Sequence, residues 1–231
     1  MKLRRPRTTD SIVCRPGSIL LFSGRGVVSQ SIQIGTCSCL THCGVCATVT
    51  AEAIRAENER REPLDRPPLV PNWPDWHDGL KFIESTTLGT RACILQGAPI
   101  SGVQCHEIPT RIREFDGEVW VMHLRERLSR DESARLTAGL LEDVGTCYDY
   151  RGALLSATIW LKHGLRAARA ADRHTLYCCE VGVNRLQKAF STLRQYRPLE
   201  PGTLAPRDVV PWAEQLYYPM ARIKARIKGK A

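Results

Sequence analysis

The 231-residue sequence has no long apolar run and few aromatic residues. Aromatic residues make up 6% of the chain, and no stretch approaches the roughly 20 apolar residues that a membrane-spanning helix needs. The basic start is followed by Thr-Thr-Asp-Ser rather than an apolar segment, so we expect no secretory signal. The sequence therefore predicts synthesis as a soluble cytoplasmic protein, which is compatible with later release by lysis or packaging into a virion.

Positive charge is concentrated at the two ends of the chain. Lys and Arg outnumber Asp and Glu by 33 to 24, and the excess falls in residues 1–7 and 222–230. Such termini are typical of solubilising tails, and also of segments that contact an anionic surface such as phospholipid or a cell-wall polymer. Nucleic-acid binding is not favoured, because few aromatic residues lie near the basic runs to stack on bases.

Of the ten cysteines, four crowd with His42 into residues 37–46. Thiolates and imidazole are preferred zinc ligands, so this cluster suggests a zinc-binding module. If residues 42–50 form a strand, however, His42 and Cys46 face one way and Cys43 the other, and one ion cannot collect them all. We therefore expect no metal or other cofactor, and the zinc module is the weakest of the alternatives.

The hydrophobic pattern predicts an α+β domain with a strand-rich first half and helices after it. A turn and strand are expected over 15–22, strands over 42–50, 80–85, 102–108 and 119–124, and helices over 131–144, 151–161 and from 178. The predicted organisation is a basic lead-in over 1–15, a domain over 16–215 with a charged, proline-rich insertion at about 51–78, and a basic tail over 216–231.

The stretch over residues 175–190 is the best candidate for chemistry. From Val181 to Phe190 apolar residues recur with a helical period, so Cys178 and Cys179 stand at or next to a helix N-terminus. The unpaired N–H groups and the positive dipole end there lower a thiol pKa from about 8.5 by about one unit or more. The same N–H groups can stabilise an oxyanion formed when a thiolate attacks a carbonyl.

A catalytic thiolate needs a base and a group that orients the base. His42 begins a predicted strand after a polar loop, where the sheet can fix its side chain, and it is the first candidate base. His174 lies close to Cys178 in the sequence and is the reserve candidate. Glu84, near the end of another strand, is the candidate that accepts a hydrogen bond from the imidazole.

Five short segments occur in the order found in one known family. They are Pro16-Gly-Ser-Ile-Leu-Leu-Phe together with Cys39-Leu-Thr-His42-Cys-Gly-Val, then Phe82-Ile-Glu84-Ser, Cys147-Tyr148-Asp-Tyr, Tyr177-Cys178-Cys179-Glu180-Val and Leu204-Ala-Pro-Arg-Asp-Val. Across about residues 16 to 210 they resemble the permuted papain-like amidases of the NlpC superfamily, in particular the YiiX-like group. The resemblance implies a permuted papain-like fold, in which a small antiparallel sheet or half-barrel packs against helices.

The resemblance also implies an activity and a site. The activity is a cysteine-dependent amide hydrolase that forms an acyl-enzyme, with peptidoglycan as the leading substrate class. Cys178 would be the nucleophile, His42 the base and Glu84 the orienting residue, with Tyr148 and Cys179 as secondary candidates. Cys179 stands where the family has a serine, which leaves the nucleophile ambiguous by one residue.

Two further interpretations stay open. The same fold can form a non-catalytic structural or binding module, for example a component of a phage particle, which the basic tails and the proline-rich insertion would suit. Members of the superfamily also move or hydrolyse lipid acyl chains, so an acyltransferase or lipid hydrolase is the second enzymatic alternative.

Overall fold

The computed structural model describes residues 14–25, 29–30, 33, 38–72, 75–87, 92–150, 175–176, 178–190, 206–214 and 216–224. The predicted helix over 151–161 and the reserve base His174 lie outside these residues. The elements, in chain order, are β1 (Ile19–Gly24), β2 (His42–Val49), α2 (Ala51–Arg61), the 3-10 helix η2 (Glu62–Leu64), β3 (Gly79–Thr86), β4 (Gly102–Glu107), α3 (Ile108–Glu114), β5 (Gly117–Met122), α4 (Arg130–Asp143), β6 (Cys147–Tyr148), β7 (Thr175–Leu176), α6 (Cys178–Ala189), α8 (Pro206–Ala213) and β8 (Ala221–Lys224).

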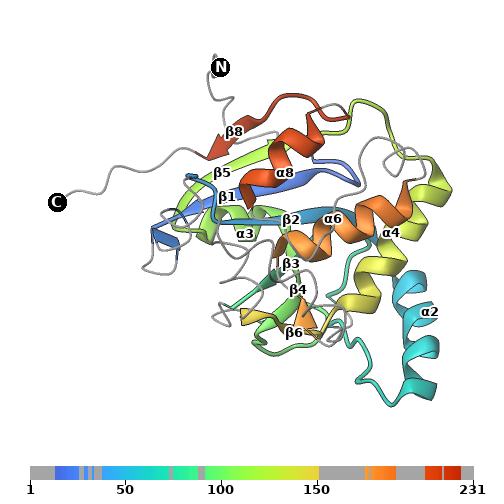
Figure 1. Cartoon of the computed structure of the whole chain (residues 1–231). Coiled ribbons are helices and arrows are strands. Elements are labelled where there is room, and N and C mark those ends of the chain that lie inside the picture. Colours follow the sequence, from blue (N-terminus) through green and yellow to red (C-terminus); the bar gives the residue numbers. More distant parts are fainter. Residues whose placement is uncertain are drawn as a thin grey trace, which may run out of the picture.

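One eight-stranded sheet, in the order β7–β6–β4–β3–β2–β1–β5–β8, organises the chain (Figure 1). Neighbouring strands pair antiparallel except β6 and β7. On β2, His42 lies opposite Phe22 of β1, and Gly44 lies opposite Glu84 of β3. Because residues two apart on a strand share a face, this register makes His42 and Glu84 diagonal neighbours on one face of the sheet.

The sheet separates two hydrophobic clusters. The larger one joins the face that carries Val45 and Ile83 to α4, α6 and α8. The smaller one joins the opposite face, with Phe22 and Phe82, to α3 through Ile112. Burial on both faces explains why β1 is apolar at four consecutive positions, Ile19–Phe22, rather than strictly alternating.

Two glycines allow close packing around β2. A Cβ atom at Gly44 would lie 2.4 Å from Cζ of Phe82 and 2.7 Å from the carbonyl oxygen of Ile83. A Cβ atom at Gly182 of α6 would lie 3.1 Å from Cγ2 of Val45. The small residues therefore let the rings of β3 and the backbone of α6 approach the strand that carries His42.

The charged segment after β2 is fixed to the domain by a buried arginine. Nη2 of Arg61, in the last turn of α2, donates to the carbonyl oxygens of Leu141 and Val144 at 2.7 and 2.8 Å, at the end of α4. Its Nε donates to Oε1 of Glu57 at 3.1 Å, and both side chains are 3% exposed. The charged segment expected at about 51–78 therefore begins with helix α2, and Arg61 joins this helix to α4, which contacts α6 through Asp143 and Arg185.

The structure confirms the α+β class and corrects three details. The sheet has eight strands and is not small, and its β6–β7 pair is parallel. Helix α3, which has a proline in its first turn, was not among the predicted elements. Residues 216–224 are not part of a basic tail, because Tyr217 is fully buried and β8 pairs with β5, which covers the otherwise unpaired edge of that strand.

Among the described helices, none combines the length and the apolar character needed to cross a membrane.

Candidate active site

Cys178 is the first residue of α6, and the surrounding contacts fix the start of this helix. The hydroxyl of Ser85 on β3 donates to the carbonyl oxygen of Leu176 at 2.6 Å, just before the helix begins. Further along α6, Nε of Arg185 donates to Oδ2 of Asp143 on α4 at 2.6 Å. With Gly182 against β2, these contacts hold the helix N-terminus beside the strands that carry His42 and Glu84.

The structure brings His42 and Glu84 into direct contact. Nε2 of His42 lies 2.5 Å from Oε2 of Glu84, whose side chain is fully buried, whereas the His42 side chain is 14% exposed. Because Nε2 is engaged by the carboxylate, Nδ1 is the imidazole nitrogen left to face another group. The sequence predicted each residue on its own strand; the structure pairs these strands, and the diagonal register explains why the two side chains meet.

Glu84 is also held by an arginine that the sequence analysis missed. Nε and Nη2 of Arg111 on α3 donate to Oε1 and Oε2 of Glu84 at 2.6 and 3.1 Å, and Nε2 of His106 lies 3.5 Å from Oε1. Burial favours the neutral acid, but Arg111, His42 and His106 outweigh it and lower the pKa of Glu84. The carboxylate is therefore ionised across the neutral range and acts as a fixed negative charge behind His42.

The signal for Arg111 was present in the sequence. Ile108 and Ile112 are one helical turn apart and both are buried, which makes 108–114 a short amphipathic helix that begins Ile-Pro. The guanidinium of Arg111 lies 5.0 Å from the ring centroid of Phe22, beside His42. The topology of the sheet decides which strands this helix packs against. The partner of Arg111 therefore followed only from the structure.

The site favours a charged pair between Cys178 and His42. Burial opposes a charge on His42, but Glu84 and Cys178, the latter also through a side-chain hydrogen bond, raise the pKa of His42 to about 9. Hydrogen bonds from the Cys179 and Cys43 thiols, together with His42, hold the pKa of Cys178 well below its usual value despite burial. A thiolate beside an imidazolium is the form that a cysteine nucleophile needs near neutral pH.

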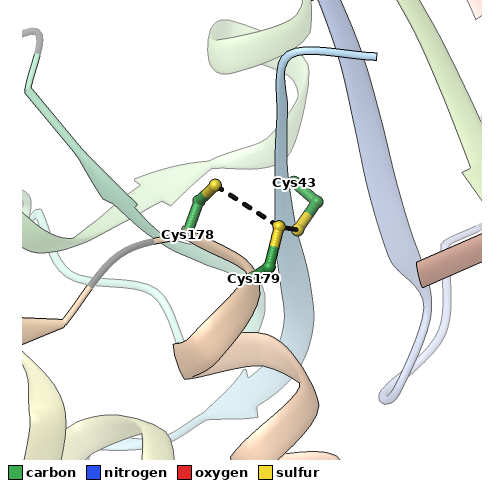
Figure 2. A group of neighbouring side chains, drawn as sticks. All are labelled: Cys43, Cys178 and Cys179. Atoms are coloured by element: carbon green, nitrogen blue, oxygen red, sulfur yellow. Dashed lines mark hydrogen bonds between the residues drawn. The ribbon is translucent and has the colours of Figure 1, made fainter. Parts of the chain in front are cut away.

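Three cysteine side chains form a cluster at the start of α6 (Figure 2). Sγ of Cys179 lies 3.4 Å from Sγ of Cys43 on β2 and 3.6 Å from Sγ of Cys178. A hydrogen bond to Cys178 is the main factor that raises the pKa of Cys43, and burial is the main factor that raises the pKa of Cys179. Of the three thiols, only Cys178 has a lowered pKa.

The cysteines of 37–46 do not converge on one point. Cys43 joins the cluster with Cys178 and Cys179, whose sulfur atoms lie within 4.8 Å of one another and could hold a thiophilic metal ion. Cys46 is on the opposite face, hydrogen-bonded with Cys14, and Cys39 is exposed. The strand alternation expected from the sequence thus separates these side chains, while Cys37 lies outside the described residues.

Tyr148, the other secondary candidate, is on β6. Its ring packs edge-on against Tyr150, with 5.1 Å between the ring centroids. Burial, followed by the negative charge of Cys178, raises the pKa of Tyr148. Its phenol therefore stays protonated near neutral pH and does not act as a base.

No protein-family model and no curated protein sequence matches this chain. Among solved structures, it is similar to the crystal structure of the metalloprotein YiiX from Escherichia coli, with 14% sequence identity and a TM-score of 0.47. The match covers 91% of this chain and 97% of that one. At this level the likeness is distant.

Proposed function

We propose that this chain is a cysteine-dependent hydrolase of amide bonds, built on a permuted papain-like fold. Cys178 is the nucleophile, His42 the general base and acid, and Glu84 the residue that orients His42. The observation that carries the proposal is the buried contact between His42 and Glu84, together with the lowered pKa of Cys178 at the start of α6.

The proposed reaction has two steps. The Cys178 thiolate attacks the amide carbon, the carbonyl oxygen becomes an oxyanion, and N–H groups in the first turn of α6 stabilise it. The imidazolium of His42 then gives its proton to the leaving amine as the C–N bond breaks, which leaves a thioester on Cys178. Neutral His42 next takes a proton from water, the hydroxide attacks the thioester, and release of the acid restores the ion pair.

Arg111 supports this cycle without contacting the substrate. During the first step His42 loses its charge, and in the absence of Arg111 the buried Glu84 carboxylate would then have only His106, 3.5 Å from its Oε1, beside it. The bidentate guanidinium neutralises the carboxylate in both protonation states of His42, so the imidazole can change its charge at a constant orientation. We therefore assign Arg111 as a positioning residue.

The substrate class is tested by trapping the acyl-enzyme. Purified protein is offered peptidoglycan stem peptides, simple peptide amides and lipid-like acyl esters, and intact mass spectrometry is used to detect an acyl group on Cys178. Cys178→Ala should form no adduct, whereas Cys147→Ala, which removes an exposed thiol, should behave like the parent protein. Full turnover by Cys178→Ala would overturn the assignment.

The same experiment separates hydrolysis from acyl transfer. If the trapped thioester decays to the free acid in water, the chain is a hydrolase. If it decays only when an amine or alcohol acceptor is added, the chain is an acyltransferase. If no substrate class acylates Cys178 although the thiolate reacts with alkylating agents, the non-catalytic module becomes the better interpretation.

A further inference from the structure

The cluster of Cys43, Cys178 and Cys179 places two protonated thiols against a thiolate. Cys43 belongs to β2 and the other two to α6, so the cluster lies between a central strand and the start of the helix (Figure 2). All three residues are buried, with 2%, 4% and 0% of their surface exposed. Hydrolysis of an amide requires only one of these sulfur atoms.

We propose that this cluster is a site of reversible oxidation by hydroperoxides, in which Cys178 is oxidised and Cys43 resolves it as a disulfide. In the first step the Cys178 sulfur attacks one peroxide oxygen, the O–O bond breaks, and Cys178 becomes a sulfenic acid while the peroxide leaves as hydroxide or alkoxide. In the second step the Cys43 sulfur attacks the sulfenic sulfur. An S–S bond forms between Cys43 and Cys178, the S–O bond breaks, and the proton of Cys43 leaves with the oxygen as water.

Cys43 is a better resolving residue than Cys179. Consecutive side chains on a helix point in different directions, so a bond between Cys178 and Cys179 would have to distort the first turn of α6. Cys43 approaches from a different element, and its sulfur lies within 4.8 Å of the Cys178 sulfur. The third thiol, Cys179, contacts both of the others: its sulfur accepts a hydrogen bond from the Cys43 thiol at 3.4 Å and lies 3.6 Å from the Cys178 sulfur.

The consequence is a nucleophile that is blocked but not destroyed. A sulfenic acid without a neighbouring thiol is oxidised further to sulfinic acid, which ordinary thiols do not reduce. The disulfide prevents this step, joins β2 to α6, and is reversed by attack of an external thiolate. Burial of the cluster favours small oxidants such as hydrogen peroxide over bulky ones.

The proposal uses the thiolate assigned under the proposed function but does not require any hydrolysis. The test therefore reads out the state of the cysteines rather than turnover. The reduced full-length chain is treated with hydrogen peroxide, digested without reductant, and mapped by mass spectrometry. We expect the peptides of Cys43 and Cys178 to be cross-linked with the loss of two hydrogen atoms, and dithiothreitol to separate them.

Matched variants make the result specific. In Cys43→Ser, which keeps the size of the side chain, and in Cys43→Ala, the cross-link should be lost and Cys178 should accumulate as sulfinic acid. Cys147→Ala should form the same cross-link as the parent protein. None of these measurements uses a substrate, so their outcomes do not depend on whether the chain hydrolyses amides. Failure of the hydrolase assignment and failure of this proposal can therefore be distinguished.

Several results would overturn the proposal. A cross-link from Cys179 instead of Cys43 would assign a different resolving residue, and equal sulfinic acid yields with and without Cys43 would show that no thiol resolves Cys178. The purified protein could also contain stoichiometric zinc or copper. If a chelator has to remove this metal before the three thiols react, the cluster is a metal site instead.

Discussion

Replacing His42 by alanine should remove most of the reactivity of Cys178 at mildly acidic pH. In the parent protein the pKa of Cys178 is lowered and that of His42 is raised to about 9. The ion pair should therefore persist through the neutral range and up to about pH 9. Alkylation of Cys178 should therefore be nearly independent of pH through neutrality, because the fraction of thiolate does not change.

The size of the effect follows from the loss of the counter-charge. Without His42, the Cys178 thiolate would be buried with only weak S–H donors beside it, so its pKa should return to about 8.5 or higher. At pH 6 a thiol with that pKa is only about 0.3% ionised, a drop of roughly 300-fold. A more basic thiolate is intrinsically more nucleophilic, with a Brønsted coefficient of about 0.4–0.5, so the observed rate should fall by between about 10- and 300-fold.

The assay follows the alkylation of each cysteine by iodoacetamide between about pH 5 and pH 9, mapped by mass spectrometry. His77→Ala is the matched control, because it removes an exposed histidine outside the site. Its Cys178 profile should match that of the parent protein. If instead the parent Cys178 reacts about tenfold faster with each added pH unit up to about pH 8.5, as an ordinary thiol does, the ion pair does not exist and the proposed mechanism fails.

Three further changes probe the framework around the site. Arg111→Met should cost about 3 kcal/mol of unfolding free energy in urea titrations at pH 7, because it leaves Glu84 with histidine partners alone. The stability that the lowered pKa of Glu84 gives the parent protein is fully present above about pH 4.3 and is lost as pH falls below that value, so the difference in unfolding free energy between the parent and the variant should shrink when the urea titrations are repeated at lower pH. Arg61→Leu should cost about 3 kcal/mol in the same urea titration, because the buried Glu57 carboxylate loses its buried partner and carbonyl groups at the end of α4 lose their hydrogen-bond donor. The control Arg60→Leu, at an exposed position, should change stability by under about 1 kcal/mol. Tyr217→Phe should cost about 1 kcal/mol and lower the melting temperature by a few degrees, because its buried hydroxyl donates to the carbonyl oxygen of residue 17 at 2.9 Å. A melting temperature equal to that of the parent protein would show that this hydrogen bond adds no net stability.

Local pattern was sufficient to predict the elements that carry the site. The run that begins at His42 was predicted as a strand over 42–50 and is observed over His42–Val49, and the helix expected over 131–144 is observed over Arg130–Asp143. Both have strong local signals: β-branched residues with little charge in the first, and a serine–glutamate capping box in the second. The contact between His42 and Glu84 could be suggested because each stands near the end of its own strand.

Long-range pairing is what the sequence left undetermined. Arg111 meets Glu84 only because α3 folds back over the face of the sheet that carries Phe22 and Phe82, and no local pattern records that direction. Tyr217 and β8 were assigned to a tail because the segment is basic, yet the unpaired edge of β5 provides backbone partners that composition does not show. Cys43 and Cys179 are 136 residues apart, and their contact depends on which face of β2 receives α6.

The arrangement of charges explains how a buried site can hold a thiolate at all. From α3 to α6 the side chains alternate in sign as Arg111, Glu84, His42 and Cys178, so each charge has an opposite neighbour and the row is neutral overall. The cost of burying one ion is high, but it falls when each member is paired and hydrogen-bonded. Removing Arg111 or Glu84 therefore affects the fold as well as the chemistry, whereas Cys178 is at the end of the row and its loss leaves the contacts of Glu84 with Arg111 and His42 in place. This difference makes Cys178→Ala the variant in which loss of activity can be interpreted without a loss of structure.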